Sequence, residues 1–190
     1  MLNTSDLLFV SATAEEAAYL PEGSDLLVTG VGTLNAAIAL AQRLAAGRPA
    51  RVLNLGTAGA LVDGYSGVYE INAAVQHDFS DELISQMTGR PQPNRIEVRP
   101  VTGLPTATLA TGDSFISDSG VRGRLARRAQ LVDMEGYAVA RVAAAYGVPV
   151  TLLKQVSDSA DEEASRTWFD AVDQGARELA AALAVVQGRA

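Results

Sequence analysis

The residues best suited to chemistry are three carboxylates, Glu16, Glu135 and Asp158, each of which follows closely on a short apolar run. Apolar runs of this length are typical of buried parallel strands, and the ligands of open α/β sheets collect at the carboxyl ends of such strands. A carboxyl group placed there can donate a proton, accept one, or hold a polar ligand. The spacing therefore makes each of the three a candidate for acid–base chemistry.

Helix capping is the competing explanation for these acids. Glu16 would stand at the start of a short helix and Glu135 at the start of a longer one, where a carboxylate complements the positive end of the helix dipole. Asp133 would then serve as one N-cap, and either Asp161 or Ser159 would cap the last helix. Both explanations stay open for Glu16 and Glu135. Capping leaves Asp158 unexplained, and a carboxylate at the end of a deep strand is costly unless it is paired, hydrogen-bonded or functional, so a functional role is favoured.

The residues that other kinds of catalysis require are absent from the sequence or too few. The chain contains no cysteine, which excludes thiol nucleophiles, thiolate zinc sites and iron–sulfur clusters. His77 is the single histidine and no Gly-x-Ser-x-Gly elbow accompanies it, so a serine-hydrolase triad is not expected. Lys154 is the single lysine, and Schiff-base chemistry would rest on it alone. No ligand-spaced cluster suggests a metal, and we expect neither a metal nor a cofactor.

Two glycine segments either approach a ligand or only make turns. Gly30-Val-Gly32 precedes a helix whose first amides could hold a polar ligand, but Asn35 stands where a dinucleotide fingerprint needs its third glycine. Asn54-Leu-Gly-Thr-Ala-Gly59 closes an apolar strand, again at a place where ligands collect or where the chain turns tightly. Neither segment decides between the two possibilities by itself.

Length and composition favour one compact domain over residues 1–190. The chain is 48% hydrophobic and 19% charged, a balance typical of globular proteins. Its formal net charge of -7 would repel a phosphate backbone, so nucleic acid is not an expected partner. No basic residue precedes Arg43 and no apolar run reaches the roughly eighteen residues of a membrane span. We therefore expect a soluble cytoplasmic protein without a membrane partner.

Strand and helix patterns alternate along the chain, which predicts an α/β fold. A Pro-rich stretch, Gly89–Pro105, is expected to form an edge strand between loops. The predicted strands are Leu7–Ala12, Leu26–Thr29, Val52–Leu55, Leu131–Met134 and Val148–Val156, and the predicted helices are Thr33–Ala46, Val121–Ala129, Glu135–Tyr146 and Glu162–Gln187.

Taken in order, these motifs resemble those of the purine nucleoside phosphorylase/nucleosidase superfamily, and most of all its methylthioadenosine/S-adenosylhomocysteine nucleosidases. The most specific segments are Val132-Asp-Met-Glu135 and Ser157-Asp-Ser-Ala-Asp161, supported by Gly112-Asp-Ser-Phe115-Ile. The resemblance runs over nearly the whole chain. It implies a three-layer α/β fold with a mixed, largely parallel central sheet flanked by helices.

The resemblance also implies roles. Asp158 would be the acid that protonates the purine at N7, Glu16 the carboxylate that activates water, and Glu135 the ligand of the ribose hydroxyls. These residue types suit the reaction, because cleavage of an N-glycosidic bond develops positive charge on the ribose and negative charge on the departing base. The other residues that the resemblance places against the substrate are Met134, Phe115, Ile116, Ser157, Thr57 and Trp168.

The implied function is hydrolysis of the N-glycosidic bond of a purine nucleoside of the 5′-methylthioadenosine or S-adenosylhomocysteine type. Asn54 stands where the related bacterial phosphorylases hold a phosphate-binding arginine, so water is favoured over phosphate as the nucleophile. A futalosine hydrolase, a purine nucleoside phosphorylase and a nucleoside-binding relative without turnover are the alternatives. The family resemblance further implies a homodimer, with the segment Phe79–Met87 among the apolar surfaces that would meet the second subunit.

Overall fold

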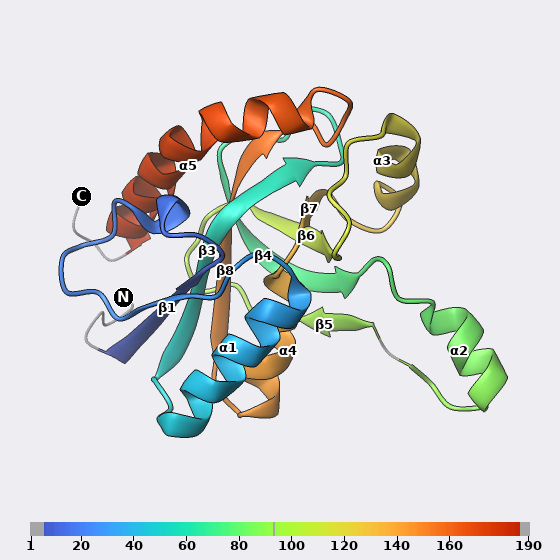
Figure 1. The fold of residues 1–190 in the computed structure, drawn as a ribbon, viewed down its shortest axis with the longest axis horizontal. Coiled ribbons are helices and arrows are strands. Elements are labelled where there is room, and N and C mark those ends of the chain that lie inside the picture. The colour runs from blue at the N-terminus through green and yellow to red at the C-terminus, as the bar shows by residue number, and fades with distance from the viewer. Residues whose placement is uncertain (1–5, 93, 187–190) are drawn as a thin grey trace.

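The computed structural model describes residues 6–92 and 94–186, without the side chains of 165–170. Its strands join into one sheet that is mixed and largely parallel (Figure 1). The strands are β1 (Leu7–Ser11), β2 (Leu26–Val28), β3 (Arg51–Ala60), β4 (Val68–Gln76), β5 (Arg95–Glu97), β6 (Thr106–Thr111), β7 (Leu131–Asp133) and β8 (Val150–Asp158).

The sheet runs in the order β2-β1-β3-β7-β6-β4-β5, and β8 closes part of it into a ring by pairing with both β3 and β4. The pairs β1–β2, β1–β3, β3–β8, β4–β6 and β6–β7 are parallel, whereas β3–β7, β4–β8 and β4–β5 are antiparallel. Because β1, β3 and β8 lie side by side and point the same way, their carboxyl ends meet at one edge of the sheet.

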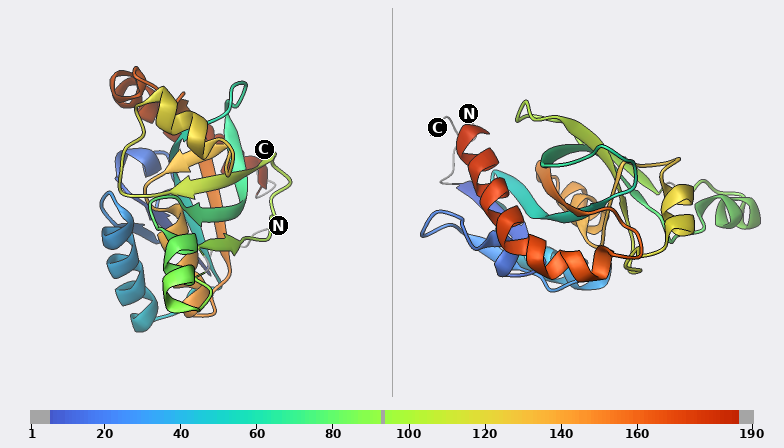
Figure 2. Two further views of the ribbon diagram at one scale, coloured as in Figure 1. Left: turned by 90° about the vertical axis from the view of Figure 1, so that its right-hand side faces the viewer. Right: turned by 90° about the horizontal axis from the view of Figure 1, so that it is seen from above.

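Helices cover the sheet from two sides (Figure 2). The long helix α5 lies across one face, where Leu179 and Leu183 pack on β1, β3 and β8. The pair α1 and α4 covers the other face, with Leu40 and Val139 in the larger apolar core. The helices are the 3-10 helix η2 (Glu15–Ala17), α1 (Thr33–Ala46), α2 (Asp81–Thr88), α3 (Ser119–Leu125), α4 (Gly136–Ala145) and α5 (Ala164–Val186).

The predicted fold class is confirmed, and so is the edge strand within the Pro-rich stretch, which is β5. The sequence analysis missed β4 and β6, because β4 interrupts its apolar residues with Glu70 and Asn72, and β6 is built of threonine and alanine around Leu109. It also missed α2, which buries none of its residues. None of the helices in the described residues has the length and apolar character of a membrane span.

One expectation about the glycine segments was wrong. The strand predicted to end at Leu55 runs on to Ala60 as β3, so Gly56 and Gly59 lie within a strand rather than in a turn. A Cβ at Gly59 would come within 2.9 Å of Asp158 Oδ1, and one at Gly56 within 3.1 Å of Lys154 Nζ. The glycines therefore make room for charged groups that cross the strand.

Candidate active site

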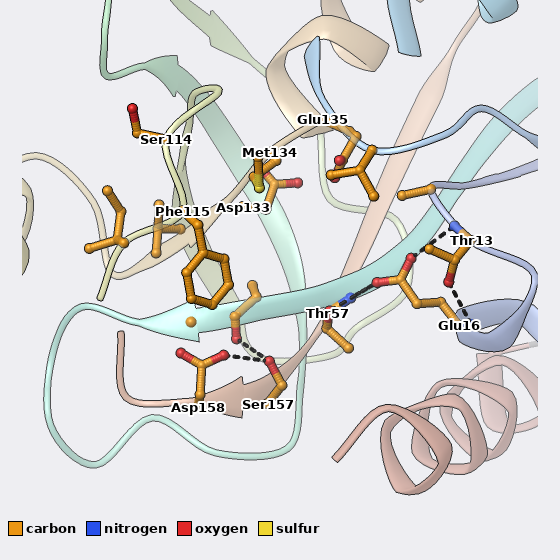
Figure 3. Close-up of a pocket in the computed structure, with 16 residues that line it drawn as sticks. Thr13, Glu16, Thr57, Ser114, Phe115, Asp133, Met134, Glu135, Ser157 and Asp158 are labelled. Atoms are coloured by element: carbon orange, nitrogen blue, oxygen red, sulfur yellow. Dashed lines mark hydrogen bonds between the residues drawn. The ribbon is translucent and has the colours of Figure 1, made fainter. Parts of the chain in front are cut away.

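A pocket of about 270 Å³ opens at the carboxyl ends of the parallel strands (Figure 3). Its walls come from segments far apart in the sequence: the loop and 3-10 helix after β1, the late part of β3, the loop after β6, the end of β7 and the end of β8. Strand ends converge here because parallel neighbours share a direction, and ligand pockets of α/β proteins lie at such edges. The volume suits a small organic ligand.

Asp158 forms one end of the pocket. The Ser157 hydroxyl donates a hydrogen bond of 2.8 Å to Asp158 Oδ2, and the Ala160 amide donates one of 2.8 Å to Oδ1. Ala160 has a positive φ of 49°, a conformation that costs a residue with a side chain about 1 kcal/mol. The tight turn after β8 thus aims an amide back at the carboxyl group, which Gly59 leaves room to accommodate.

Glu16 lies toward the other end of the pocket, on η2, and is buried. Its Oε1 accepts hydrogen bonds from the Thr57 amide at 2.8 Å and from the Thr57 hydroxyl at 2.9 Å. Its Oε2 accepts bonds from the Ser11 hydroxyl at 3.2 Å and from the Thr13 amide at 3.4 Å. These donors, which come from β1, the loop after it and β3, hold the carboxylate in one orientation, and Figure 3 shows the contacts with Thr13 and Thr57.

Glu135 stands at the N-cap position of α4, but its side chain makes no capping hydrogen bond to that helix. Its Oε1 accepts a hydrogen bond of 2.8 Å from the amide of Gly32, at the start of α1. Burial raises the pKa of the Glu135 carboxyl to about 7, and the Asp133 carboxylate adds to this rise, while Lys154 and the Gly32 amide oppose it. The Gly32 amide therefore binds a protein carboxylate, whereas the Gly30 amide donates to the Ala12 carbonyl, so this glycine segment supports the site with both a turn and a polar contact.

Asp133 and Lys154 form a buried ion pair beside Glu135. Lys154 Nζ lies 2.8 Å from Asp133 Oδ2, and each side chain is 1% exposed. The same carboxylate accepts hydrogen bonds from the Thr111 hydroxyl at 2.6 Å and from the Gly136 amide at 2.8 Å. Asp133 thus combines the capping contact expected of it with an ion pair that the sequence analysis did not foresee.

Apolar groups make up the remaining walls. Phe115 is half exposed and its ring points into the pocket near Asp158, while Met134 lies on the opposite wall beside Glu135 (Figure 3). Ile116 is buried and anchors the loop after β6 in a small apolar cluster with Val132. An aromatic ring and a thioether opposite a carboxyl group suit a flat, partly polar ligand.

The structure brings together in this pocket all of the residues implicated by the sequence except Trp168, whose side chain lies outside the described residues. Those placed on its walls are Glu16, Thr57, Phe115, Ile116, Met134, Glu135, Ser157 and Asp158. Sequence reasoning missed Asp133 and the Lys154 beneath it. The signal available was a lone lysine within an otherwise apolar strand, a position that calls for a partner.

Family comparisons agree with this geometry. Residues 26–187 match the phosphorylase superfamily. The chain belongs to this superfamily. The resemblance predicted from the motifs is therefore confirmed.

Among superfamily relatives, the 5′-methylthioadenosine/S-adenosylhomocysteine nucleosidase of Shewanella oneidensis is 31% identical over 90% of this chain and 81% of its own length. The Streptococcus pneumoniae MTA/SAH nucleosidase, solved with 8-aminoadenine, matches the fold with a TM-score of 0.83 at 22% identity, over 97% of this chain and 100% of that one. A futalosine hydrolase mutant of Helicobacter pylori matches equally well, with a TM-score of 0.83 at 20% identity over 97% and 99%. The fold alone does not separate these activities.

Proposed function

We propose that this protein hydrolyses the N-glycosidic bond of a purine nucleoside of the 5′-methylthioadenosine or S-adenosylhomocysteine type and releases the free base. The observation that carries the proposal is the meeting of Asp158, Glu16 and Glu135 in one pocket, from three separate segments of the chain. The names of the curated relatives support the same hydrolase class.

The base occupies the end of the pocket near Asp158 and Phe115. There the Asp158 carboxyl group donates a proton to the purine nitrogen N7, which removes the negative charge that develops as the bond to the sugar breaks. Ser157 and the Ala160 amide hold the carboxyl group in place. The ring of Phe115 stacks on the base, with the Ile116 backbone at its edge, and orients N7 toward the acid.

The ribose occupies the end near Glu135 and Met134. The Glu135 carboxylate accepts hydrogen bonds from the ribose hydroxyls and stabilises the positive charge that forms on the sugar. Glu16 accepts a proton from the attacking water, so the water oxygen forms a bond to the anomeric carbon as the bond to the base nitrogen breaks. Thr57 orients Glu16 for this step, and Trp168 is assigned to cover the 5′-substituent.

Water is favoured as the nucleophile because the described residues that line the pocket include no cationic side chain. Carboxylates dominate its polar walls, and Lys154, the nearest described cation, is buried and ion-paired with Asp133. Asn54, at the position of the phosphorylases' arginine, is buried and donates a hydrogen bond to the Val10 carbonyl. A phosphate ion would meet repulsion at both ends of the pocket.

Release of free base in phosphate-free buffer is the test. The substrates are 5′-methylthioadenosine, S-adenosylhomocysteine, adenosine, inosine and futalosine, and the product is measured by chromatography. Rapid release from the first two confirms the proposal, and preferential release from futalosine reassigns the substrate. Activity only with added phosphate would make the protein a phosphorylase. Binding by calorimetry without release from any of the five would make it a binding protein.

A homodimer forms part of the proposal. The turn before α1 and the outer side of that helix expose three apolar side chains, Val31, Leu34 and Ile38, of which Val31 lines the pocket. The helix α2 stands away from the body of the molecule with Leu83 and Met87 exposed (Figure 1). Apolar surfaces of this kind mark interfaces. Light scattering tests the assembly, and a monomer that turns over substrate at the full rate would contradict it.

A further inference from the structure

Lys154 is a buried cation that the proposed reaction leaves without a task. It projects from β8 at the register position opposite Gly56 of β3. A Cβ on Gly56 would lie 3.1 Å from Lys154 Nζ and 3.2 Å from Glu16 Oε1. The ammonium group therefore passes over β3 at a position without a side chain, close to Glu16, and reaches Asp133 at the end of β7.

The charges around Lys154 do not balance. Glu16, Asp133 and Glu135 are all buried, and the ammonium group of Lys154 interacts electrostatically with all three carboxyl groups. Burial by itself would lower the pKa of Lys154, but the three carboxylates raise it above its usual value, so the lysine is charged. The described groups that face Glu135 are Asp133 on β7, Lys154 on β8, Glu16 on η2 and the amide of Gly32 before α1.

Of the three carboxylates, Glu135 is the one held most loosely. Asp133 is saturated by Thr111, the Gly136 amide and Lys154, and Glu16 accepts four hydrogen bonds. Glu135 accepts one, from Gly32. Its own partner in the proposed reaction is the ribose, which needs the ionised form.

We propose that Lys154 is a positioning residue that keeps Glu135 in its ionised, ribose-binding form, and that the opposition between Lys154 and Asp133 sets the lower end of the working pH range. The inference rests on the proposed function, because that function gives Glu135 its role as the ligand of the ribose. It stands on the 2.8 Å ion pair between Lys154 and Asp133, the burial of all four side chains and the single hydrogen bond of Glu135, and it can be measured without turnover.

Opposite charge changes test it. Asp133→Asn removes repulsion from Glu135 while it keeps the size and the hydrogen-bond acceptor for Thr111. Lys154→Met removes the attraction between the Lys154 ammonium group and the Glu135 carboxylate. Because the pKa of Glu135 is raised to about 7, we expect the acid limb in the pH profile of kcat/KM for base release to fall near pH 7 in the parent protein. We expect Asp133→Asn to move this limb to lower pH by about one unit and Lys154→Met to move it to higher pH by a similar amount.

Four further variants serve as controls. The double variant Lys154→Met/Asp133→Asn returns the limb close to its original position, and Lys154→Arg keeps it there. Thr111→Val removes a hydrogen bond to Asp133 without a change in charge, and leaves the limb in place. In Glu135→Gln the acid limb of the pH profile should disappear, and its disappearance would assign the limb to the Glu135 carboxyl group. Lys154→Met strands a buried carboxylate, and if it does not fold, Asp133→Asn and the double variant decide the matter.

A limb that stays fixed in Asp133→Asn, or moves upward in pH, overturns the inference, because a merely structural role predicts loss of activity without this shift. Titration of the Glu135 carboxyl carbon by ¹³C NMR gives a readout without turnover, and the signal is assigned by its absence in Glu135→Gln. Failure to release base from any nucleoside would defeat the proposed function, whereas a double variant in which Glu135 titrates as it does in Asp133→Asn alone would defeat the role of Lys154.

Discussion

The two ends of the pocket are built in different ways. At the end assigned to the base, Asp158 takes its hydrogen bonds from Ser157 and Ala160, one and two residues away. At the end assigned to the ribose, Glu135 meets an amide 103 positions away and Glu16 meets one 41 positions away. The hydrogen bonds that hold the carboxyl group at the base end thus lie within one turn. The hydrogen bonds at the ribose end form only when β1, β3, β7, β8 and α1 come together.

The electrostatics of the two ends differ in the same sense. Asp158 is half-buried, and its hydrogen bonds come from Ser157 and Ala160 rather than from the ion pair. Glu16, Asp133, Glu135 and Lys154 are each less than a tenth exposed and share one cluster. Changes at the base end should therefore alter chemistry with little effect on folding. Changes at the ribose end should alter chemistry, stability and pH dependence together.

The largest effect is expected for Asp158→Asn. The amide keeps the size of the side chain but cannot donate a carboxyl proton to N7, so kcat should fall by roughly 10²–10⁴-fold while nucleoside affinity changes little. Asp161→Asn, three residues along the same turn and outside the pocket, is the matched control and should keep its activity. Steady-state kinetics and calorimetry measure both quantities. Equal losses in the two variants would show that the turn, rather than the acid, matters.

Glu16→Gln should reduce kcat to a similar extent, roughly 10²–10⁴-fold, because an amide cannot accept the proton of the attacking water. The neighbouring Glu15 is exposed, which makes Glu15→Gln a control that differs by a single position. Base release by the two variants is compared in one assay. If Glu15→Gln lost as much activity as Glu16→Gln, the negative charge at the helix start would be the cause, and the capping explanation would hold.

Glu135→Gln should weaken both affinity and turnover, each by about tenfold or more, since charge beside the ribose is lost. Its effect on stability has a defined sign. A carboxyl group whose pKa rises to about 7 on folding binds protons more tightly in the native state, so native stability falls as pH increases from about 4.5 to 7. The stability of Glu135→Gln does not decrease in this way, because its amide does not titrate. Urea unfolding should show it stabilised, relative to the parent, by about 3 kcal/mol at most at pH 8 and by little at pH 4.

Two glycines of β3 allow the two ends of the pocket to be compared directly. Gly59 lies against Asp158 at the base end, and Gly56 lies against Lys154 and Glu16 at the ribose end. In Gly59→Ala the new methyl group would lie 2.9 Å from Asp158 Oδ1 and 3.0 Å from Ala160 Cβ, so the acid must move, and turnover should fall about tenfold. In Gly56→Ala the close atoms are Lys154 Nζ and Glu16 Oε1, at 3.1 and 3.2 Å, and the loss should appear mainly as about 1–3 kcal/mol of stability. Thermal unfolding beside kinetics separates the outcomes.

The smallest effect is expected from phosphate. Because neither end of the pocket presents a described cation to solvent, added phosphate at millimolar concentration should change the rate of base release by less than about twofold. Sulfate at equal ionic strength controls for salt. Acceleration by phosphate, with a sugar 1-phosphate among the products, would contradict the assignment of both ends.

Particular residues show how far sequence reasoning could go. Asp158 was predicted as functional because capping did not account for it, and the strands on either side of Glu16 and Glu135 were predicted from their apolar runs. The continuation of β3 through Gly56 and Gly59 was missed because glycine is more often a turn residue than a strand residue. Lys154 was missed because strand patterns report average burial, and they do not say which charged group an isolated lysine meets.

By itself, the sequence determined the α/β alternation, the order of the motifs and the presence of a carboxylate after each of three strands, because these depend on local apolar periodicity and on residue type. Only the tertiary structure decided that Glu135 binds the Gly32 amide, that Asp133 pairs with Lys154, and that two glycines leave space for charged groups. The reason is physical. Burial and the coupling between charges depend on distances through space, and those distances are set only when separate segments pack together.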